Sequence, residues 1–151
     1  MQEYKLKNIE TRGKYMVVEK YLNAAVAPWF KQPDHLTATV LYLRLSLSAI
    51  NSDGTGFTEP DASSGYQPYP IPINATNWTA AVNGVVTNTQ TILMNTITIN
   101  SGTATHWFLS ESANGNAVIF DKFKEPRPLV VDSNIQVNPG ELRIGVQNII
   151  V

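Results

Sequence analysis

The chain has 151 residues, no cysteine and a formal charge of −1, and 15% of its residues are charged. This length suits one domain, with or without an arm, and is sufficient to bury a core. The lack of cysteine excludes disulfides, thiolate catalysis and zinc–thiolate sites, and the scattered Lys and Arg offer no basic stripe for nucleic acid.

The first residues divide into an arm and a helical segment. Residues 1–12 are polar and mixed, and we expect an N-terminal arm there. Residues 13–27 carry a helical period, because Val18, Leu22 and Val26 are spaced four residues apart. The sequence therefore predicts one N-terminal α-helix over residues 13–27.

The predicted helix ends at Pro28, which cannot continue it. Trp29 and Phe30 follow as large apolar side chains in a segment that otherwise resembles a loop, and we interpret them as candidate partner contacts. Packing within the chain and docking to a partner are equally compatible with this pattern. No stretch suits a membrane-spanning helix or a secretory signal, so we expect no membrane partner.

After the helix the sequence has the period of strands. Apolar and polar residues alternate from Leu41 to Ser48, which predicts a long strand with one apolar and one polar face. Residues 51–69 contain several Gly and Pro and predict a long exposed loop with a contact role. Pro70 and Pro72 restrict the next segment to an edge strand.

Further turns divide the rest of the chain into short strands. Asn83-Gly84 predicts a hairpin with a type I′ turn. Residues 91–99 read as a strand rich in β-branched side chains, and Ala113-Asn-Gly115 predicts a second hairpin. Residues 141–147 alternate as a final strand. Together these signals predict an all-β fold, an antiparallel β-sandwich (jelly-roll-like or Ig-like) of about seven or eight strands, in which residues 13–151 form a single domain.

The order of these motifs resembles a family of small bacteriophage virion proteins of the tail-fibre or minor structural type. The resemblance runs from about Lys14 onwards, and its specificity lies in the order of the motifs. One departure is the run from Gln67 to Pro70, where the family often has an arginine. The matching motifs are Val40–Ser46, Thr58-Glu59-Pro60, Gly65-Tyr66, Trp78, Asn88, Trp107-Phe108-Leu109, Gly115-Asn116 and Pro139-Gly140.

The resemblance implies a non-enzymatic structural component of a phage virion, made in the host bacterial cytoplasm and located in the particle. Its partners would be other virion proteins, and its own copies would form a homo-oligomer, with a trimer favoured if the assembly is fibre-like. No cofactor, metal or catalytic residue is implied. The alternative function is a carbohydrate-binding module that recognises a host-surface glycan through the 51–69 loop.

Individual side chains in and near this loop admit two interpretations each. Phe57, Tyr66 and Tyr69 are candidate partner or glycan contacts, although aromatic rings also form the core of any small sandwich. The acidic residues between Asn51 and Asp61 lack the spacing of a calcium loop, and turn chemistry explains them better. His106 is interpreted as a half-buried structural residue of a strand and not as part of a Ser–His–Asp site with Ser110 and Asp121.

Overall fold

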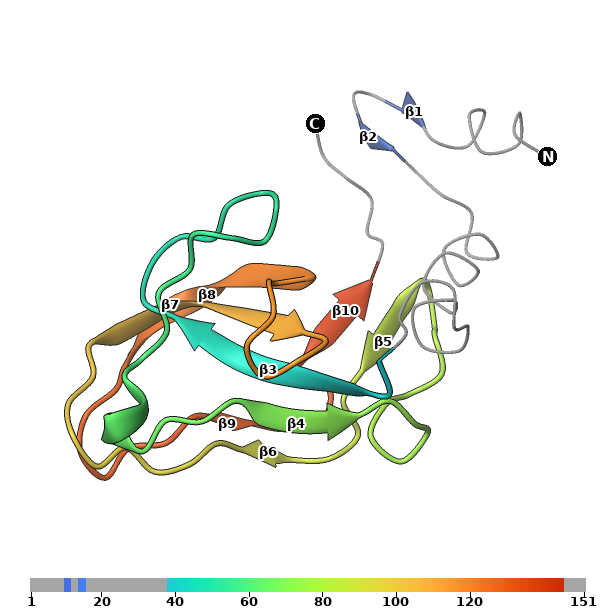
Figure 1. Cartoon of the computed structure of the whole chain (residues 1–151). Helices are drawn as coiled ribbons and strands as arrows, with labels where there is room; N and C mark the ends of the chain where they lie inside the picture. The colour runs from blue at the N-terminus through green and yellow to red at the C-terminus, as the bar shows by residue number, and fades with distance from the viewer. Residues whose placement is uncertain (1–9, 12–13, 16–37, 146–151) are drawn as a thin grey trace. The chain divides into compact units, whose positions relative to one another are not determined.

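The computed structural model describes residues 10–11, 14–15 and 38–145, and the regular secondary structure of these residues is almost entirely β, with antiparallel pairing (Figure 1). The one helical element among them is the short 3-10 helix η1, Ala62–Ser64. The strands are β1 (Glu10–Thr11), β2 (Lys14–Tyr15), β3 (Val40–Ser46), β4 (Tyr69–Pro72), β5 (Val85–Thr87), β6 (Ile92–Leu93), β7 (Thr103–Ser110), β8 (Ile119–Pro128), β9 (Gln136–Val137) and β10 (Arg143–Gly145).

The predicted helix 13–27 lies outside the described residues except at its first turn. There the structure differs from the prediction, because Lys14–Tyr15 form β2 and pair with β1. The expected arm, residues 1–12, is described only at Glu10–Thr11, which form β1.

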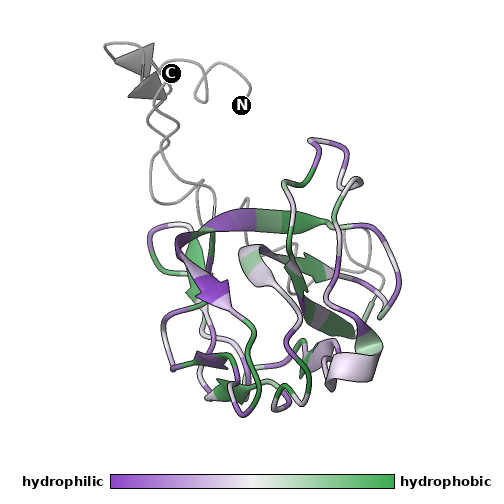
Figure 2. Cartoon of the chain, turned by 90° about the vertical axis from the view of Figure 1, so that its left-hand side faces the viewer, coloured by the Kyte–Doolittle hydropathy of each residue, from purple (hydrophilic) through white to green (hydrophobic). Residues whose placement is uncertain are grey.

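The chain divides into two compact units. The larger unit comprises Ala38–Ile73 and Thr91–Asn138, and the smaller unit comprises Met1–Thr37, Asn74–Gln90 and Pro139–Val151. Figure 2 shows hydrophobic and hydrophilic stretches interspersed along the described part of the chain.

The larger unit is built on a four-stranded antiparallel sheet in the order β4-β3-β7-β8. β3 lies at its centre, with Leu41 opposite Ile71 on one side and Leu43 opposite Leu109 on the other. Because side chains alternate along a strand, these four residues share one face and form the main core. Each such fully buried side chain contributes roughly 2 kcal/mol to folding. The other buried apolar residues of this unit include Leu45, Ile92, Met94, Ile97, Ala104, Phe108 and Leu129.

The opposite face of β3 is the predicted polar face, and it is buried. Arg44 and Ser46 on this face are 2% and 0% exposed. The segment that follows β3 returns over this face, with Leu47 N donating to Thr58 O at 2.7 Å. The alternation of the sequence is real, but residues distant along the chain cover both faces of the strand.

Two predicted features of the sheet are confirmed. β4 is an edge strand, since among the described strands it pairs only with β3 and carries Pro70 and Pro72. β7 and β8 form the hairpin predicted around Ala113-Asn-Gly115, with a register irregularity between Ala104 and His106.

The strand predicted over residues 91–99 is much shorter, because only Ile92–Leu93 form β6, paired with β9. Beyond it the backbone bonds at irregular intervals: Met94 N donates to Ile135 O and Ile97 N to Ser133 O. Ile92, Met94 and Ile97 are buried, so the two-residue period breaks between Met94 and Ile97.

The smaller unit confirms the Asn83-Gly84 hairpin. Val82 and Val85 exchange both backbone hydrogen bonds, at 2.9 and 3.0 Å. Asn83 and Gly84 have φ of 51° and 73°, the positive values of a type I′ turn. β5 then pairs with β10, whose residues alternate as predicted as far as Gly145.

Candidate functional site

A buried arginine organises one face of the sheet in the larger unit. Arg44 Nε donates to Glu59 Oε1 at 2.9 Å and Nη2 donates to Oε2 at 2.5 Å, which is the two-pronged geometry of a strong arginine–carboxylate pair. Nη1 donates to the hydroxyl of Ser110 at 3.1 Å and to the carbonyl oxygen of Gly115 at 2.5 Å. One guanidinium therefore connects β3, the segment after β3, the end of β7 and the β7–β8 turn.

Two aromatic rings lie against the same guanidinium. Its central carbon lies 5.1 Å from the ring centroid of Phe57 and 4.7 Å from that of Phe108. The two centroids are 4.6 Å apart, so the rings also contact each other. Stacking of a cation on ring faces adds to the hydrogen bonds and removes the arginine from water. Phe57 is consequently held by packing although it lies in a loop.

Tyr66 completes the network. Its hydroxyl donates to Glu59 Oε1 at 2.8 Å and accepts from the backbone N–H of Leu45 at 3.0 Å. Burial raises the pKa of the Tyr66 phenol well above its ordinary value, and the nearby Glu59 carboxylate adds to this effect. The phenol thus stays neutral and serves as both donor and acceptor.

The outer part of the loop rests on the β7–β8 turn. Ala117 N donates to Gly54 O at 3.0 Å. Gly54 is buried with φ of 81°, and a Cβ at this position would overlap the carbonyl oxygen of Ala117. Only glycine permits this close approach of two backbones. We call the surface formed by residues 51–54 and 112–116 the tip.

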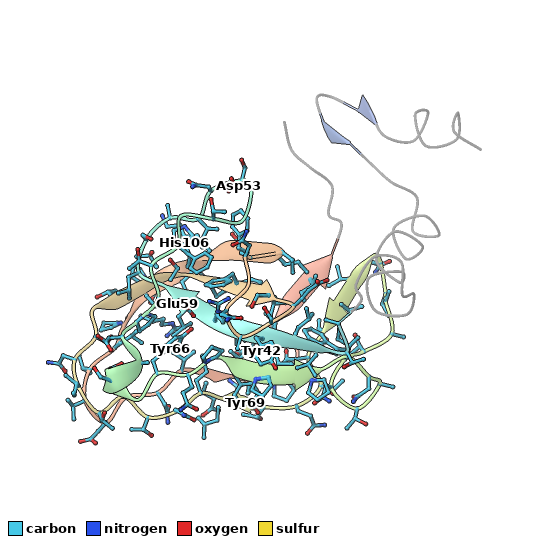
Figure 3. All side chains as sticks on the ribbon, viewed as in Figure 1. Tyr42, Asp53, Glu59, Tyr66, Tyr69 and His106 are labelled. Atoms are coloured by element: carbon cyan, nitrogen blue, oxygen red, sulfur yellow. The ribbon has the colours of Figure 1, made fainter. Side chains whose placement is uncertain are left out.

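The tip is shaped by local hydrogen bonds and exposes polar groups, of which Asp53 is the charged one. Asp53 Oδ1 accepts from the backbone and the hydroxyl of Thr55, at 3.0 and 2.6 Å, and these bonds lower the pKa of the Asp53 carboxyl. Figure 3 shows Asp53 at the outer end of the loop, with Glu59 and Tyr66 where the chain returns over the sheet. The exposed residues of the tip are Asn51, Ser52, Asp53, Ser112, Ala113, Asn114 and Asn116.

The structure brings together some of the residues singled out in the sequence. Phe57 and Tyr66 belong to the Arg44 network, and Tyr66 is 5% exposed. Tyr69 is half-buried at the start of β4. Trp29 and Phe30 lie outside the described residues. A contact role for all five residues stays a prediction.

Sequence reasoning missed the importance of Arg44, Ser110 and the Gly115 carbonyl. One signal was present: an arginine in the middle of an otherwise apolar strand needs a partner if it is covered, and Glu59 comes shortly afterwards next to a proline. The predicted long exposed loop is exposed at residues 51–53, 56, 58, 61–63 and 67, but Gly54, Pro60, Ser64 and Tyr66 within it are buried.

Asp53 and Asp61 act in turns, as predicted, whereas Glu59 pairs with Arg44. Asp61 Oδ1 accepts from Ser63 N at 2.8 Å and caps η1, which lowers the pKa of the Asp61 carboxyl. Across residues 10–11, 14–15 and 38–145, no group of three His, Cys, Asp or Glu is arranged to hold a metal ion. The same residues include no helix that is long and apolar enough to cross a membrane.

His106 is half-buried on β7, in agreement with its structural interpretation, and its Nδ1 lies 2.8 Å from Thr105 Oγ1. The register places Lys122 and not Asp121 opposite His106. The Ser110 hydroxyl accepts from Arg44 and donates to the carbonyl oxygen of Ser112 at 2.7 Å. The three side chains of the imagined Ser–His–Asp site are thus engaged separately.

Comparison with known proteins gives one family. No curated protein matches the chain. Residues 18–145 match the family described as podophage GP4 fiber I protein gp80, which covers every element from β3 to β10. The resemblance found in the order of the motifs is thereby confirmed: the chain belongs to this family of phage fibre proteins.

Proposed function

We propose that this protein is a non-enzymatic structural subunit of a phage virion that docks to other virion proteins through the tip. Membership of a phage fibre family supports a structural role in the particle and location there. The single observation that carries the docking role is the Arg44 network, which fixes the tip on the sheet.

A buried ion pair holds the tip in place. Removing an arginine and a glutamate from water costs several kcal/mol per ion, and well-packed apolar residues often stabilise a fold equally well. What the ion pair adds here is geometry, because it joins β3 to residues 15 and 71 positions away in the sequence. A surface loop fixed in advance pays less entropy when it binds, which favours a contact role.

Substitution at the tip tests this proposal. Ser52→Arg with Asn114→Arg adds bulk and charge to two exposed positions, and Thr91→Arg with Asn95→Arg makes the same change at exposed positions elsewhere in the larger unit. We expect both proteins to fold, and only the tip variant to be lost from purified particles. Normal incorporation of the tip variant would show that docking uses another surface.

Self-association is part of the proposal, with a trimer favoured if the assembly is fibre-like. A nearly neutral chain with many uncharged polar residues tolerates close contact between copies, and closed symmetric homo-oligomers are the commonest assemblies. Light scattering of the full chain at micromolar concentration should give the molar mass of an oligomer of the 16.7 kDa chain. A stable monomer would contradict self-association.

The finer arrangement of the fold is also a proposal. We infer that residues 13–151 unfold as one β-sandwich domain, supported by the antiparallel sheets of both units and the apolar faces that they bury. Calorimetry should then give a single transition. Two separate transitions would instead mean that the two units unfold independently.

The second candidate function is recognition of a host-surface glycan through residues 51–69. It is favoured by the exposed amides and hydroxyls of the tip, which suit a ligand rich in hydroxyls, and by the half-buried ring of Tyr69 beside the exposed Gln67. Binding of the purified protein to polysaccharide extracted from the host surface, and its loss in Tyr69→Ala, would favour this function over docking alone.

A further inference from the structure

We propose that Asp121 closes the edge of β8 to a second copy of the chain, and so keeps the four-stranded sheet from growing by strand addition. Open sheet edges present unpaired backbone groups, which are a template for unwanted pairing. The proposal concerns which surface is barred from self-association, and it stands whether or not the tip is the docking surface.

The register determines which backbone groups face outward. Ile73 N donates to Thr39 O at 2.8 Å, so the odd-numbered residues of β3 bond to β4 and the even-numbered ones to β7. The even-numbered residues of β7 therefore bond to β3 and the odd-numbered ones to β8, which makes Trp107 and Asp121 a hydrogen-bonded pair. The N–H groups of Phe120 and Lys122 must therefore point away from the sheet.

The two edges of the sheet are closed by different means. On β4 the same alternation places Pro70 and Pro72 at the outward positions, and proline has no N–H to offer. On β8, proline occurs only at 126 and 128, so the segment from Ile119 to Glu125 has no such protection. Among the described strands β8 pairs with β7 alone.

Asp121 supplies the missing protection in part by a hydrogen bond. Its Oδ1 accepts from the backbone N–H of Lys122 at 2.7 Å. One of the two outward donors of the regular part of β8 is thereby occupied by a neighbouring side chain. An incoming strand would have to displace this bond before it could pair.

Like-charged side chains on β8 supply the rest of the protection against pairing. In a two-fold antiparallel pairing of two β8 strands centred on Asp121, Phe120 of each copy bonds Lys122 of the other and the two Asp121 carboxylates face each other. Centring the pair on Lys122 opposes two lysines, and centring it on Phe123 opposes Lys122 to Lys124 and Asp121 to Glu125. Like charges directly opposite one another destabilise a strand pair, so these three registers are disfavoured.

Three variants of the full chain test the proposal. Asp121→Ala removes the hydrogen bond and the charge, Asp121→Asn keeps an acceptor without the charge, and Glu111→Ala matches the change of net charge at a residue between β7 and β8. By sedimentation velocity, we expect Asp121→Ala to double the mass of the wild-type species as concentration rises. Asp121→Asn should do so less, and Glu111→Ala should match wild type.

Amide exchange distinguishes strand pairing from other association. In paired Asp121→Ala, the amides of Phe120 and Lys122 should exchange more slowly than in wild type. If the mass is unchanged and the Lys122 amide exchanges faster, Asp121 is only a local cap and the proposal is wrong. Slow exchange at Phe120 in the wild-type protein would also overturn it, because the edge would then already be paired.

Discussion

Arg44 and Glu59 form an ion pair that is nearly removed from water, with side chains 2% and 25% exposed. Arg44→Met should destabilise the protein by about 3 kcal/mol, because it leaves the Glu59 carboxylate without its cation and removes the donor to the Ser110 hydroxyl and the Gly115 carbonyl. Urea unfolding of Arg44→Met, Glu59→Leu and the double variant measures the coupling. The double variant should lose less unfolding free energy than the two single variants lose together. A loss equal to that sum would show that the pair is not coupled.

Tyr66 makes the free energy of unfolding depend on pH in the alkaline range. The unfolded phenol ionises near its ordinary pKa of 10.0, whereas burial raises the pKa of the folded phenol. The unfolded state therefore releases its proton first, so this contribution is complete below pH 10 and is lost as the pH rises above it. Between about pH 10 and pH 12, wild type should lose more stability than Tyr66→Phe. Parallel pH profiles for the two proteins would mean that Tyr66 ionises normally.

At the scale of elements, the contact between the loop and the β7–β8 turn depends on glycine. Gly54→Ala should cost about 2–4 kcal/mol, from the positive φ and from overlap with the Ala117 carbonyl. Gly140→Ala is the matched control, since Gly140 has φ of 83° but nothing within 4 Å of its added Cβ. Its cost should be about 1 kcal/mol, that of the backbone alone. Equal losses of stability for Gly54→Ala and Gly140→Ala in thermal unfolding would mean that the loop does not contact the β7–β8 turn.

The Asn83-Gly84 turn allows a second comparison. Gly84→Val should lower stability by about 1–3 kcal/mol, because a β-branched residue is strained at φ of 73°. Asn83→Gly, at φ of 51°, relieves strain and should change stability little. An unchanged melting temperature for Gly84→Val would contradict the type I′ geometry.

How far each element could be predicted follows from the range of the interactions that fix it. The turn at Asn83-Gly84 and the edge position of Pro70 and Pro72 depend on local backbone chemistry, and the sequence predicts them correctly. The burial of Arg44 depends on Glu59 and on the distant Gly115, which no local pattern links to it. The segment 91–99 has strand-forming residues, but its backbone bonds to the segment around Ser133 and Ile135 at irregular positions and not as a continuous ladder.

For the whole molecule, the order of weak motifs identified the family although no single motif did. The sequence predicts contacts through the loop 51–69 and offers five aromatic candidates, Trp29, Phe30, Phe57, Tyr66 and Tyr69, whose contact role stays a prediction. Two of these, Phe57 and Tyr66, are used inside the chain. What they leave outside is a fixed polar tip, and this is the surface that we propose docks to the virion.

The most direct test of this account is the map of an intact phage particle at a resolution that traces this chain. The account predicts the protein in the particle, with a neighbouring virion protein in contact with residues 51–54 and 112–116. A tip that faces solvent on all sides would contradict docking through it. Absence of the protein from purified particles would contradict the structural role itself.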